Sequence, residues 1–376
     1  MTFYSTYDEI PFDRINIGVK ERKYLRYMME GITRGIGNVH ARVEVMIVNG
    51  QLIPFSIKDG GMNQSWIHSF TGQYIDEMVS ETSRMNLPAC LKPVTNAVLT
   101  VGRFVLNPTC EKTVTVFPSF MSTTMYEGYE FDQIELITKL LSERYPKHAI
   151  CFRTLNDKFH KREMKLLNNA GYERLISRAV YIYDSNEQHS KNERKDLKKD
   201  IKKFNKSGLT FTMTLNDEDF AQLVPLYEQV YLDKYSHFNP HYTAEFFKFM
   251  YESTNLQWFV LKDEGRIVSF MAVQEAGNTL FPAYFGMDQS IKHLYFITSG
   301  LLYEFAKRNG YAINNSAGAK DYKLARGSRP YLEYHYVYIK HLPLMKQLNY
   351  LSFIRCATTI GTPALKRTQF EVVVQF

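Results

Sequence analysis

The stretch SAGAKDYKLARGS, residues 316–328, carries two glycines, three cations, one carboxylate and a tyrosine directly after the strand-like segment YAIN. Before it, ITSGLLYEFAKRNG (297–310) has the pattern of a helix that ends at a glycine. Further upstream, residues 256–288 read as three strands joined by turns at 263–265 and 276–278. Strands, a helix, a strand and then a polar, glycine-containing loop predict an α+β domain with helices on the faces of a sheet.

The first half of the chain has a similar order of elements. Val43, Val45 and Ile47 alternate with their neighbours, and Asn49-Gly50 follows before QLIPFSI, which predicts a hairpin. Helices are expected over residues 21–30, 74–85, 132–147 and 161–171, a buried strand at HAICFRTLN and a closing strand at SRAVYIYD. The repeat of element order favours two α+β domains, which suits a chain of 376 residues.

Composition narrows the class of protein. The chain is 45% hydrophobic and 23% charged, as in ordinary soluble proteins. The four cysteines (Cys90, Cys110, Cys151 and Cys356) show no C-x-x-C spacing, so we expect reduced thiols and no zinc or thioredoxin-type motif. The N-terminus lacks a basic segment followed by an apolar one, and no run of about 18 uncharged apolar residues occurs. We therefore predict a cytoplasmic protein without a transmembrane segment.

A basic segment, KNERKDLKKDIKKFNK (191–206), joins the two halves and supplies +5 of the net charge of +7. Its cations are spaced 3, 1, 3, 1, 3, 1, 3, which forms one stripe on a helix, while Leu197, Ile201 and Phe204 form a narrow apolar stripe. One interpretation is a surface for the phosphates of a phosphopantetheine cofactor, a tRNA or an anionic membrane. The other is a solvated linker helix with Glu193, Asp196 and Asp200 as local partners of the cations.

Three segments of the second half carry a family resemblance: AYFGMD (283–288), LLYEFAKRNGY (301–311) and NNSAGAKDYKLARG (314–327). They resemble the Fem-like branch of the GNAT acyltransferase superfamily, with Gly318, Tyr322, Lys323 and Gly327 matching its Gly-x-x-x-Tyr-Lys-x-x-x-Gly pattern. The resemblance implies tandem GNAT-like domains, each a mixed or antiparallel sheet flanked by helices. We place them at 1–188, as a degenerate domain, and at 208–345, as the catalytic domain, with a linker helix at 189–207 and a tail at 346–376.

The resemblance also implies an N-acyltransferase, in which an amine attacks a thioester or aminoacyl ester without a covalent enzyme intermediate. The glycine-rich acetyl-CoA loop of standard GNAT enzymes is missing, because DQSIKHLYFITSGLL stands in its place. The acyl donor therefore stays open among acyl-CoA, an acyl carrier protein thioester and aminoacyl-tRNA. The acceptor would be an amine on a small molecule or a peptide precursor.

Four residues are the predicted catalytic group: Lys323 to stabilise an oxyanion, Tyr322 to protonate a leaving group, Asp288 as the base, and Tyr284 on the same strand as Gly286. Each also has a structural interpretation, as a loop lysine, a core tyrosine or a turn residue. Glu275 is a rival base on the preceding strand.

Binding residues are predicted in three places. The acceptor is expected at the polar, aromatic loop DKYSHFNPHY, through Tyr235, His237, Asn239 and His241, and at Asn315 and Ser316. Donor phosphates are expected at Arg194, Lys198 and Lys202. No metal is predicted, because Pro240 breaks any helix between the two histidines. Ser122, Thr123 and Thr124 are possible ligands in a first domain that is otherwise structural or one wall of the acceptor cleft.

Hydrolase, NTPase and dehydrogenase classes are disfavoured, because G-x-S-x-G, Walker and Rossmann motifs are missing. Two alternatives to a soluble acyltransferase remain. One is a nucleic-acid-binding protein that uses the basic segment without catalysis. The other is a peripheral membrane protein that N-acylates a lipid head group, with LNYLSFIRCATTIG (348–361) as an interfacial helix. The oligomeric state is not predicted.

Overall fold

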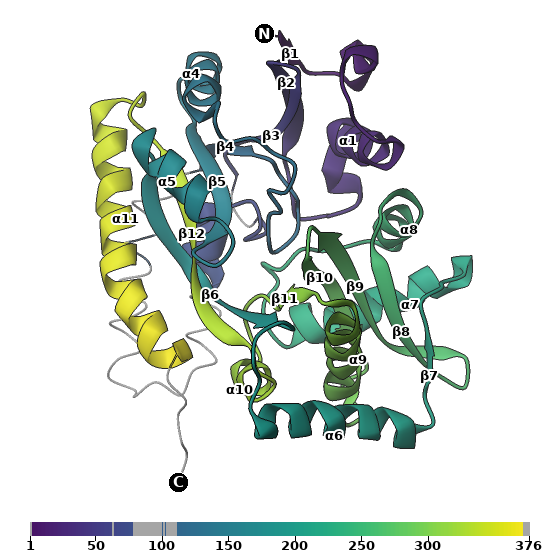
Figure 1. The fold of residues 1–376 in the computed structure, drawn as a ribbon. Helices are drawn as coiled ribbons and strands as arrows, with labels where there is room; N and C mark the ends of the chain where they lie inside the picture. The colour runs from purple at the N-terminus through teal and green to yellow at the C-terminus, as the bar shows by residue number, and fades with distance from the viewer. Residues whose placement is uncertain (1, 62–63, 78–99, 101, 103–110, 371–376) are drawn as a thin grey trace. The chain divides into compact units, whose positions relative to one another are not determined.

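The computed structural model describes residues 2–61, 64–77, 100, 102 and 111–370 (Figure 1). Strands and helices alternate along the chain, so the fold is α+β as predicted. The chain divides into two compact units. Unit 1 comprises Met1–Ser177, Tyr235–Thr243 and Tyr334–Gly361, and unit 2 comprises Arg178–Lys234, Ala244–Glu333 and Thr362–Phe376.

In the described part of unit 1, the strands follow the order β1-β2-β3-β4-β5-β12, with β4 parallel to β5 and the pairs among β1 to β4 antiparallel. The strands are β1 (Thr2–Tyr4), β2 (Arg42–Val48), β3 (Gln51–Asp59), β4 (Lys112–Val116), β5 (Ala149–Asn156) and part of β12 (Arg329–Tyr338). The helices are α1 (Val19–Gly31), α4 (Ile134–Arg144), α5 (Lys161–Asn169) and most of α11 (Leu344–Leu365), with short 3-10 and π turns at Tyr7–Glu9, Phe12–Arg14, Ile32–Arg34 and Gly72–Asp76.

Unit 2 has the strand order β6-β11-β10-β9-β8-β7, with β10 parallel to β11 and the other pairs antiparallel. The strands are β6 (Glu173–Asp184), β7 (Thr210–Thr212), β8 (Gln257–Asp263), β9 (Arg266–Ala276), β10 (Thr279–Met287) and β11 (Ala312–Asn314). The helices are α6 (Lys191–Ser207), α7 (Phe220–Glu228), α8 (Ala244–Ser253), α9 (Leu294–Asn309) and α10 (Lys320–Ala325), with turns at Asp217–Asp219, Gln229–Asp233 and Lys366–Phe370.

The last strand of each half of the chain is exchanged. Strand β6 ends the first half, yet its residues from Arg178 onward belong to unit 2, where Asp184 pairs with Ala312 of β11. Strand β12 ends the second half, yet Tyr334–Tyr338 belong to unit 1 beside β5. The segment Tyr235–Thr243 also lies in unit 1. The continuous boundaries predicted from the sequence do not describe these exchanges.

Local signals in the sequence account for most elements. Asn49 and Gly50 both have positive φ (48° and 82°), which makes the tight β2–β3 hairpin that the sequence predicts. Helix α9 ends at Gly310 with φ 77°, also as predicted. The expected helix 74–85 is described only through residue 77, and the rest lies outside the described residues. The stretch that read as a loop, 316–328, contains the short helix α10.

Each unit has its own buried apolar core. In unit 1, α11 packs through Tyr350 and Ile354 against residues of β5, β12 and the turn at Gly72–Asp76. In unit 2, α9 packs through Leu302, Tyr303 and Ala306 against β8 to β11. The sheet and helices of unit 2 hold the loop between β11 and α10 in place, and the segment 316–328 begins in that loop.

Candidate active site

Lys323 lies beneath the loop that joins β11 to α10, and its ammonium group is enclosed by main-chain oxygens. Its Nζ donates to the carbonyl oxygens of Asn315 (2.7 Å), Ser316 (3.3 Å) and Ala317 (2.7 Å). The side chain is only 5% exposed and lies over the ring of Tyr181, 5.6 Å from the ring centre. The lysine therefore holds the shape of the loop rather than projecting from it.

The hydrogen bonds of Lys323 to three carbonyls also orient the amide groups of the loop. In a trans peptide the C=O of one residue and the N–H of the next point in opposite directions. The amides of Ser316, Ala317 and Gly318 therefore point away from the ammonium group. The Ser316 amide donates to Asn314 Oδ1 (3.1 Å). The amides of exposed Ala317 and Gly318 have no acceptor among the described residues, so they can donate to a ligand.

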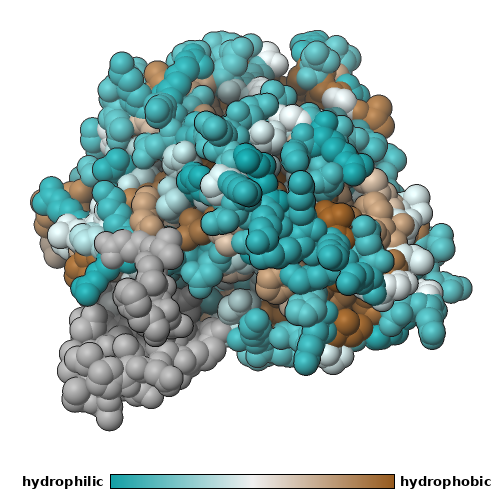
Figure 2. Space-filling model, turned by 60° about the horizontal axis from the view of Figure 1, so that its bottom comes forward, coloured by the Kyte–Doolittle hydropathy of each residue, from teal (hydrophilic) through white to brown (hydrophobic). Residues whose placement is uncertain are grey.

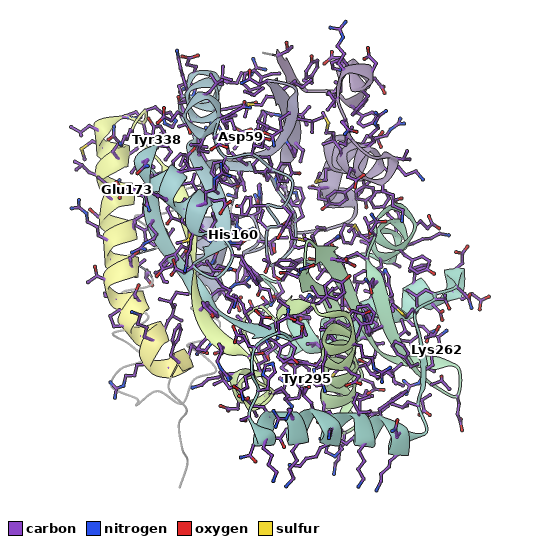
Figure 3. The ribbon with its side chains drawn as sticks, in the orientation of Figure 1. Asp59, His160, Glu173, Lys262, Tyr295 and Tyr338 are labelled. Atoms are coloured by element: carbon purple, nitrogen blue, oxygen red, sulfur yellow. The ribbon has the colours of Figure 1, made fainter. Side chains whose placement is uncertain are left out.

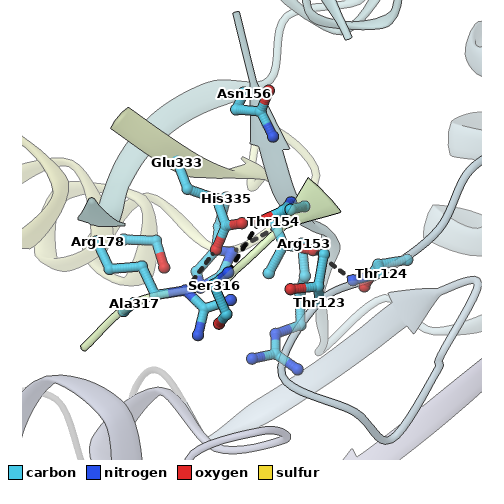
Figure 4. Close-up of polar contacts among 12 residues, drawn as sticks. Thr123, Thr124, Arg153, Thr154, Asn156, Arg178, Ser316, Ala317, Glu333 and His335 are labelled. Atoms are coloured by element: carbon cyan, nitrogen blue, oxygen red, sulfur yellow. Dashed lines mark hydrogen bonds and ion pairs between the residues drawn. The ribbon is translucent and has the colours of Figure 1, made fainter. Parts of the chain in front are cut away.

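The surroundings of Lys323 change its proton affinity. Burial, with a smaller contribution from the Arg178 guanidinium, lowers the pKa of Lys323 to about 7. Arg178 itself pairs with the fully buried carboxylate of Glu333, Nε to Oε1 2.7 Å (Figure 4). Unit 2 thus holds two cations and one carboxylate next to this loop, a concentration of buried charge that is more common at functional sites than in structural cores.

Tyr322 contributes to a buried polar network that fixes α10 against α6. Its hydroxyl donates to Asp200 Oδ2 (3.2 Å), and burial raises its pKa well above the usual value. Arg326 donates to both oxygens of the same carboxylate, Nε to Oδ2 at 2.8 Å and Nη2 to Oδ1 at 3.1 Å. Lys203 adds a fourth bond at 2.9 Å. Tyr322 therefore acts as an anchor of α10, and its ring packs between Tyr295 and Phe296.

A second network holds the start of the loop. Asn315 Nδ2 donates to the hydroxyls of Tyr303 (3.0 Å) and Ser328 (3.2 Å), which are themselves 2.8 Å apart. Ser316 contributes its carbonyl to Lys323, and its carbonyl also accepts from the Tyr181 amide (3.2 Å). Both residues were predicted to bind substrate; the structure places them in the loop itself, with Asn315 side-chain donors already engaged.

The predicted base and its neighbours lie elsewhere in unit 2. Asp288 pairs with Arg266 (3.1 Å) and accepts from the amide and hydroxyl of Ser290, and these bonds lower its pKa, which makes it a weaker base. Tyr284 is 2% exposed and packs edge-on against Phe246 and Phe247, which is a core position. Glu275 accepts hydrogen bonds from Gln257 and Tyr311.

The loop predicted to bind the acceptor is folded as part of unit 1. Asn38 accepts from the His241 amide (3.0 Å) and donates to the carbonyls of His237 (3.3 Å) and Asn239 (2.8 Å). Asn239 accepts from Trp66 Nε1 (2.9 Å), and His241 Nε2 contacts the His237 carbonyl (2.9 Å). Tyr235 is 43% exposed. Lys323 and this loop therefore belong to different units, so the structure does not assign them to one site.

Helix α6 presents its cations to solvent, as the spacing predicted. Leu197 and Phe204 pack against the α9 side of the core, and seven of the ten exposed residues of α6 are cations: Lys191, Arg194, Lys195, Lys198, Lys199, Lys202 and Lys206. Their side chains project away from α9 (Figure 3), on a mostly hydrophilic face (Figure 2). Of the acidic residues, Glu193 forms the capping box with Ser190, Asp196 pairs with Lys199, and the buried Asp200 pairs with Lys203.

Unit 1 contains a separate small pocket, part of it open to solvent, lined by Trp66, His68, Gln73, Cys151 and Arg153 among others. Next to it, Lys58 and Glu111 form a buried ion pair. Burial, then the charges of Lys58 and Arg153, lowers the pKa of His68 to about 3, so its imidazole is neutral.

The three hydroxyl residues proposed in unit 1 include two that are packed inside. Thr123 is 6% exposed and Thr124 is 3% exposed. The Thr124 amide donates to Thr154 Oγ1 (2.7 Å), and the Thr154 amide donates to His335 Nδ1 (3.1 Å; Figure 4). Within the described residues, no group of three His, Cys, Asp or Glu side chains could hold a metal ion. In the same part of the chain, no helix is long and apolar enough to cross a membrane.

Sequence reasoning missed Arg178, Glu333 and the role of Asp200. A charge inside a strand that otherwise reads as buried was the available signal for Arg178 in SRAVYIYD and for Glu333 before YHYVYIK. For Asp200 the signal was its angle on the helix: at 100° per residue it lies within 60° of Leu197, on the apolar side.

Comparison with known proteins identifies the family to which the chain belongs. The FemAB_like family model, described as peptidoglycan biosynthesis/recognition, matches residues 148–366, more than half of the chain. No curated protein matches the chain. Among solved structures, the L-PGS of Bacillus licheniformis is 17% identical with a TM-score of 0.44, covering 58% of this chain and 78% of its own.

Two further structures resemble the chain over most of its length. FemX is 9% identical with a TM-score of 0.45 and covers 85% of this chain and 96% of its own. A tandem GNAT protein from the clavulanic acid biosynthesis pathway is 9% identical with a TM-score of 0.37 and covers 90% and 98%. At such identities and scores these likenesses say nothing about the substrate. The family match itself supports an acyl or aminoacyl transferase, and on that match the chain belongs to the FemAB_like family.

Proposed function

We propose that the protein is an aminoacyltransferase that moves an aminoacyl group from tRNA to the amine of a peptide precursor, with unit 2 as the catalytic unit. The family match supports the class of reaction and a precursor of the peptidoglycan type. The catalytic assignment is supported by the hydrogen bonds of Lys323 to three loop carbonyls. These bonds leave the Ala317 and Gly318 amides directed outward.

In the proposed reaction the acceptor nitrogen attacks the carbonyl carbon of the aminoacyl ester. The carbonyl oxygen becomes an oxyanion, which accepts hydrogen bonds from the amides of Ala317 and Gly318. The charge of Lys323, on the opposite side of the same peptide groups, polarises these amides. An amide bond forms, the ester C–O bond breaks, and the proton lost by the amine ends on the departing ribose oxygen.

The basic face of α6 supports tRNA as the donor rather than a coenzyme. Its 17 residues rise over about 25 Å, so a row of seven exposed cations matches several consecutive phosphates. A single pyrophosphate would need far fewer contacts, and the glycine-rich loop that binds it in standard GNAT enzymes is missing. Arg194, Lys198 and Lys202 are proposed phosphate contacts.

The direct test incubates candidate amine acceptors with aminoacyl-tRNA, acyl-CoA or an acyl carrier protein thioester and records product masses. We expect product with aminoacyl-tRNA, and a loss of about 10²–10³ in kcat for Lys323→Ala. Lys320→Ala is the matched control, because Lys320 is on the same helix but donates to the Thr368 carbonyl. Equal rates for the two variants would remove Lys323 from the reaction, and turnover only with a thioester donor would reject tRNA.

The donor surface is tested separately. Replacing Arg194, Lys198 and Lys202 together with Gln should raise KM for the charged tRNA, leave kcat unchanged, and reduce the slope of log affinity against log salt by about 2–3. Replacing the exposed Lys139, Lys161 and Lys165 of unit 1 removes the same charge and should change neither value. Retention of RNA by the unaltered protein without turnover of any donor would favour a nucleic-acid-binding protein instead.

A further inference from the structure

We propose that the outer face of α11 lies on an anionic lipid surface, so that the protein is peripheral to a membrane. The inference rests on Leu344, Met345, Leu348, Arg355 and Ile360, and it is independent of the proposed aminoacyl transfer. None of these residues takes part in the site around Lys323.

Helix α11 has one buried side and one side with no partner among the described residues. Tyr350 and Ile354 are 1% and 3% exposed and pack into the core of unit 1. At 100° per residue, Leu348 and Thr359 lie on the opposite side of the helix. Leu344 is 68% exposed, Met345 69%, Leu348 48% and Ile360 66%, which is half of the large apolar side chains that the described structure exposes.

The composition of this outer side is unlike that of a solvated helix. Ten residues of α11 are exposed, and Arg355 is the only charged one; the others are Leu344, Met345, Leu348, Ser352, Cys356, Thr359, Ile360, Pro363 and Ala364. Helix α6 also exposes ten residues, and seven of them are cations. Water solvates a charged face well, whereas an apolar face of this length is stabilised when something covers it.

The charge of the segment indicates what covers it. Residues 334–370 contain no Asp or Glu and five cations: Lys340, Lys346, Arg355, Lys366 and Arg367. A segment of this kind is attracted to anionic head groups and is not repelled by them. The apolar residues also extend along the helix, since Leu344 and Ile360 are about 24 Å apart at 1.5 Å per residue. An outer side of this length, with Leu344 and Ile360 on its two flanks, fits a plane such as a bilayer surface better than the compact centre of a protein interface.

Co-sedimentation with vesicles tests the inference on the full chain. The probes are vesicles of phosphatidylcholine alone and of equimolar phosphatidylglycerol and phosphatidylcholine. We expect the protein to bind the anionic vesicles, with an affinity that falls as salt rises, and to bind phosphatidylcholine at least about tenfold more weakly. The triple variant Leu344→Gln, Met345→Gln, Leu348→Gln should lose about tenfold or more of the affinity for anionic vesicles.

Two matched variants keep the result interpretable. Phe211→Gln with Met213→Gln removes apolar side chains that are 38% and 40% exposed on unit 2, and should leave vesicle binding unchanged. Lys198→Gln with Lys202→Gln tests whether α6 is the membrane contact instead, and should also leave binding unchanged. Circular dichroism checks that every variant is folded.

Several results would overturn the inference. One is an unaltered protein that stays in the supernatant with both vesicle types, and another is an α11 triple variant that binds as tightly as the unaltered protein. Loss of vesicle binding in the α6 variant alone would show that α6, and not α11, contacts the membrane. A dimer of the unaltered protein that the α11 variant converts to a monomer would show that a second copy of the chain covers this face.

Discussion

Replacing Arg326 with Met should destabilise unit 2 strongly, because it leaves the carboxylate of Asp200 buried without its main partner. The two side chains are 9% and 0% exposed and are joined by two hydrogen bonds. Removing one partner of a buried pair costs about 3–5 kcal/mol of the free energy of unfolding. Lys203 and Tyr322 remain to contact Asp200, so we expect a value near 3 kcal/mol.

The chain offers a clean reporter for this measurement. It has two tryptophans, and Trp258 is buried in unit 2 at 1% exposure. In a Trp66→Phe background, urea unfolding followed by fluorescence therefore reports unit 2 alone. The double variant with Asp200→Asn should lose less than the sum of the two single changes, with a coupling of about 2 kcal/mol or more.

The matched control is Arg308→Met. Arg308 pairs with Glu304 on α9 at 2.9 Å, but its side chain is 74% exposed, so the loss should stay below about 1 kcal/mol. If Arg326→Met costs no more than Arg308→Met, or if the double variant shows no coupling, the Asp200 network does not fix α10 and the reasoning fails.

Three further outcomes are expected. Burial lowers the pKa of Lys323 from 10.5 to about 7, so between these pH values the unfolded chain binds more protons than the folded one. The free energy of unfolding, measured by urea titration at pH 7 and at pH 10, should therefore rise with pH relative to that of Lys323→Met. A difference between the two proteins that is the same at both pH values would contradict this. Gly300→Ala should lower the free energy of unfolding by about 1–3 kcal/mol in the same assay, because the added Cβ would lie 2.8 Å from Asp200 Cβ. Alanine by itself favours a helix, so a gain in stability would show that α6 moves aside. Ser190→Ala removes the capping box of α6 and should cost about 1 kcal/mol by urea unfolding, whereas no change would mean that the cap is dispensable.

The sequence was sufficient for features that depend on neighbours in the chain. Asn49-Gly50 predicts its hairpin because both residues accept positive φ, and the 3, 1 spacing of cations predicts the exposed stripe of α6. The same spacing contained Asp200, which we interpreted as a local partner of the lysines. Asp200 is buried against Gly300 because of its place beside Leu197 on the helix, and its negative charge does not prevent this.

Pairing between distant strands could not be predicted. Both SRAVYIYD and EYHYVYIK alternate as strands do, and β6 and β12 are strands. Alternation sets which face of a sheet a residue occupies, but it does not name the neighbouring strand. The sequence pattern therefore predicts neither the exchange of β6 and β12 nor the inclusion of Tyr235–Thr243 in unit 1. That second fact places the predicted acceptor loop and Lys323 in different units.

A comparison of the two units supports the proposal that unit 2 is the catalytic one. In each, a parallel strand pair joined by a helix is followed by a loop and a short helix: β4–α4–β5 and α5 in unit 1, β10–α9–β11 and α10 in unit 2. In unit 1, the side chain of Asn156 accepts from the amides of Lys158 and Phe159, both at 3.1 Å, so those donors are used within the loop.

In unit 2 the strand ends at Asn314, whose side chain takes only the Ser316 amide, and Lys323 binds carbonyls instead of amides. A lysine can only donate, so it must turn the carbonyls inward, and the amides that follow them must turn outward. At this loop position the backbone amides therefore bond within the loop in unit 1, whereas in unit 2 they stay available to a ligand. An oxyanion needs donors that nothing else has engaged, and the loop above Lys323 supplies two of them, the amides of Ala317 and Gly318.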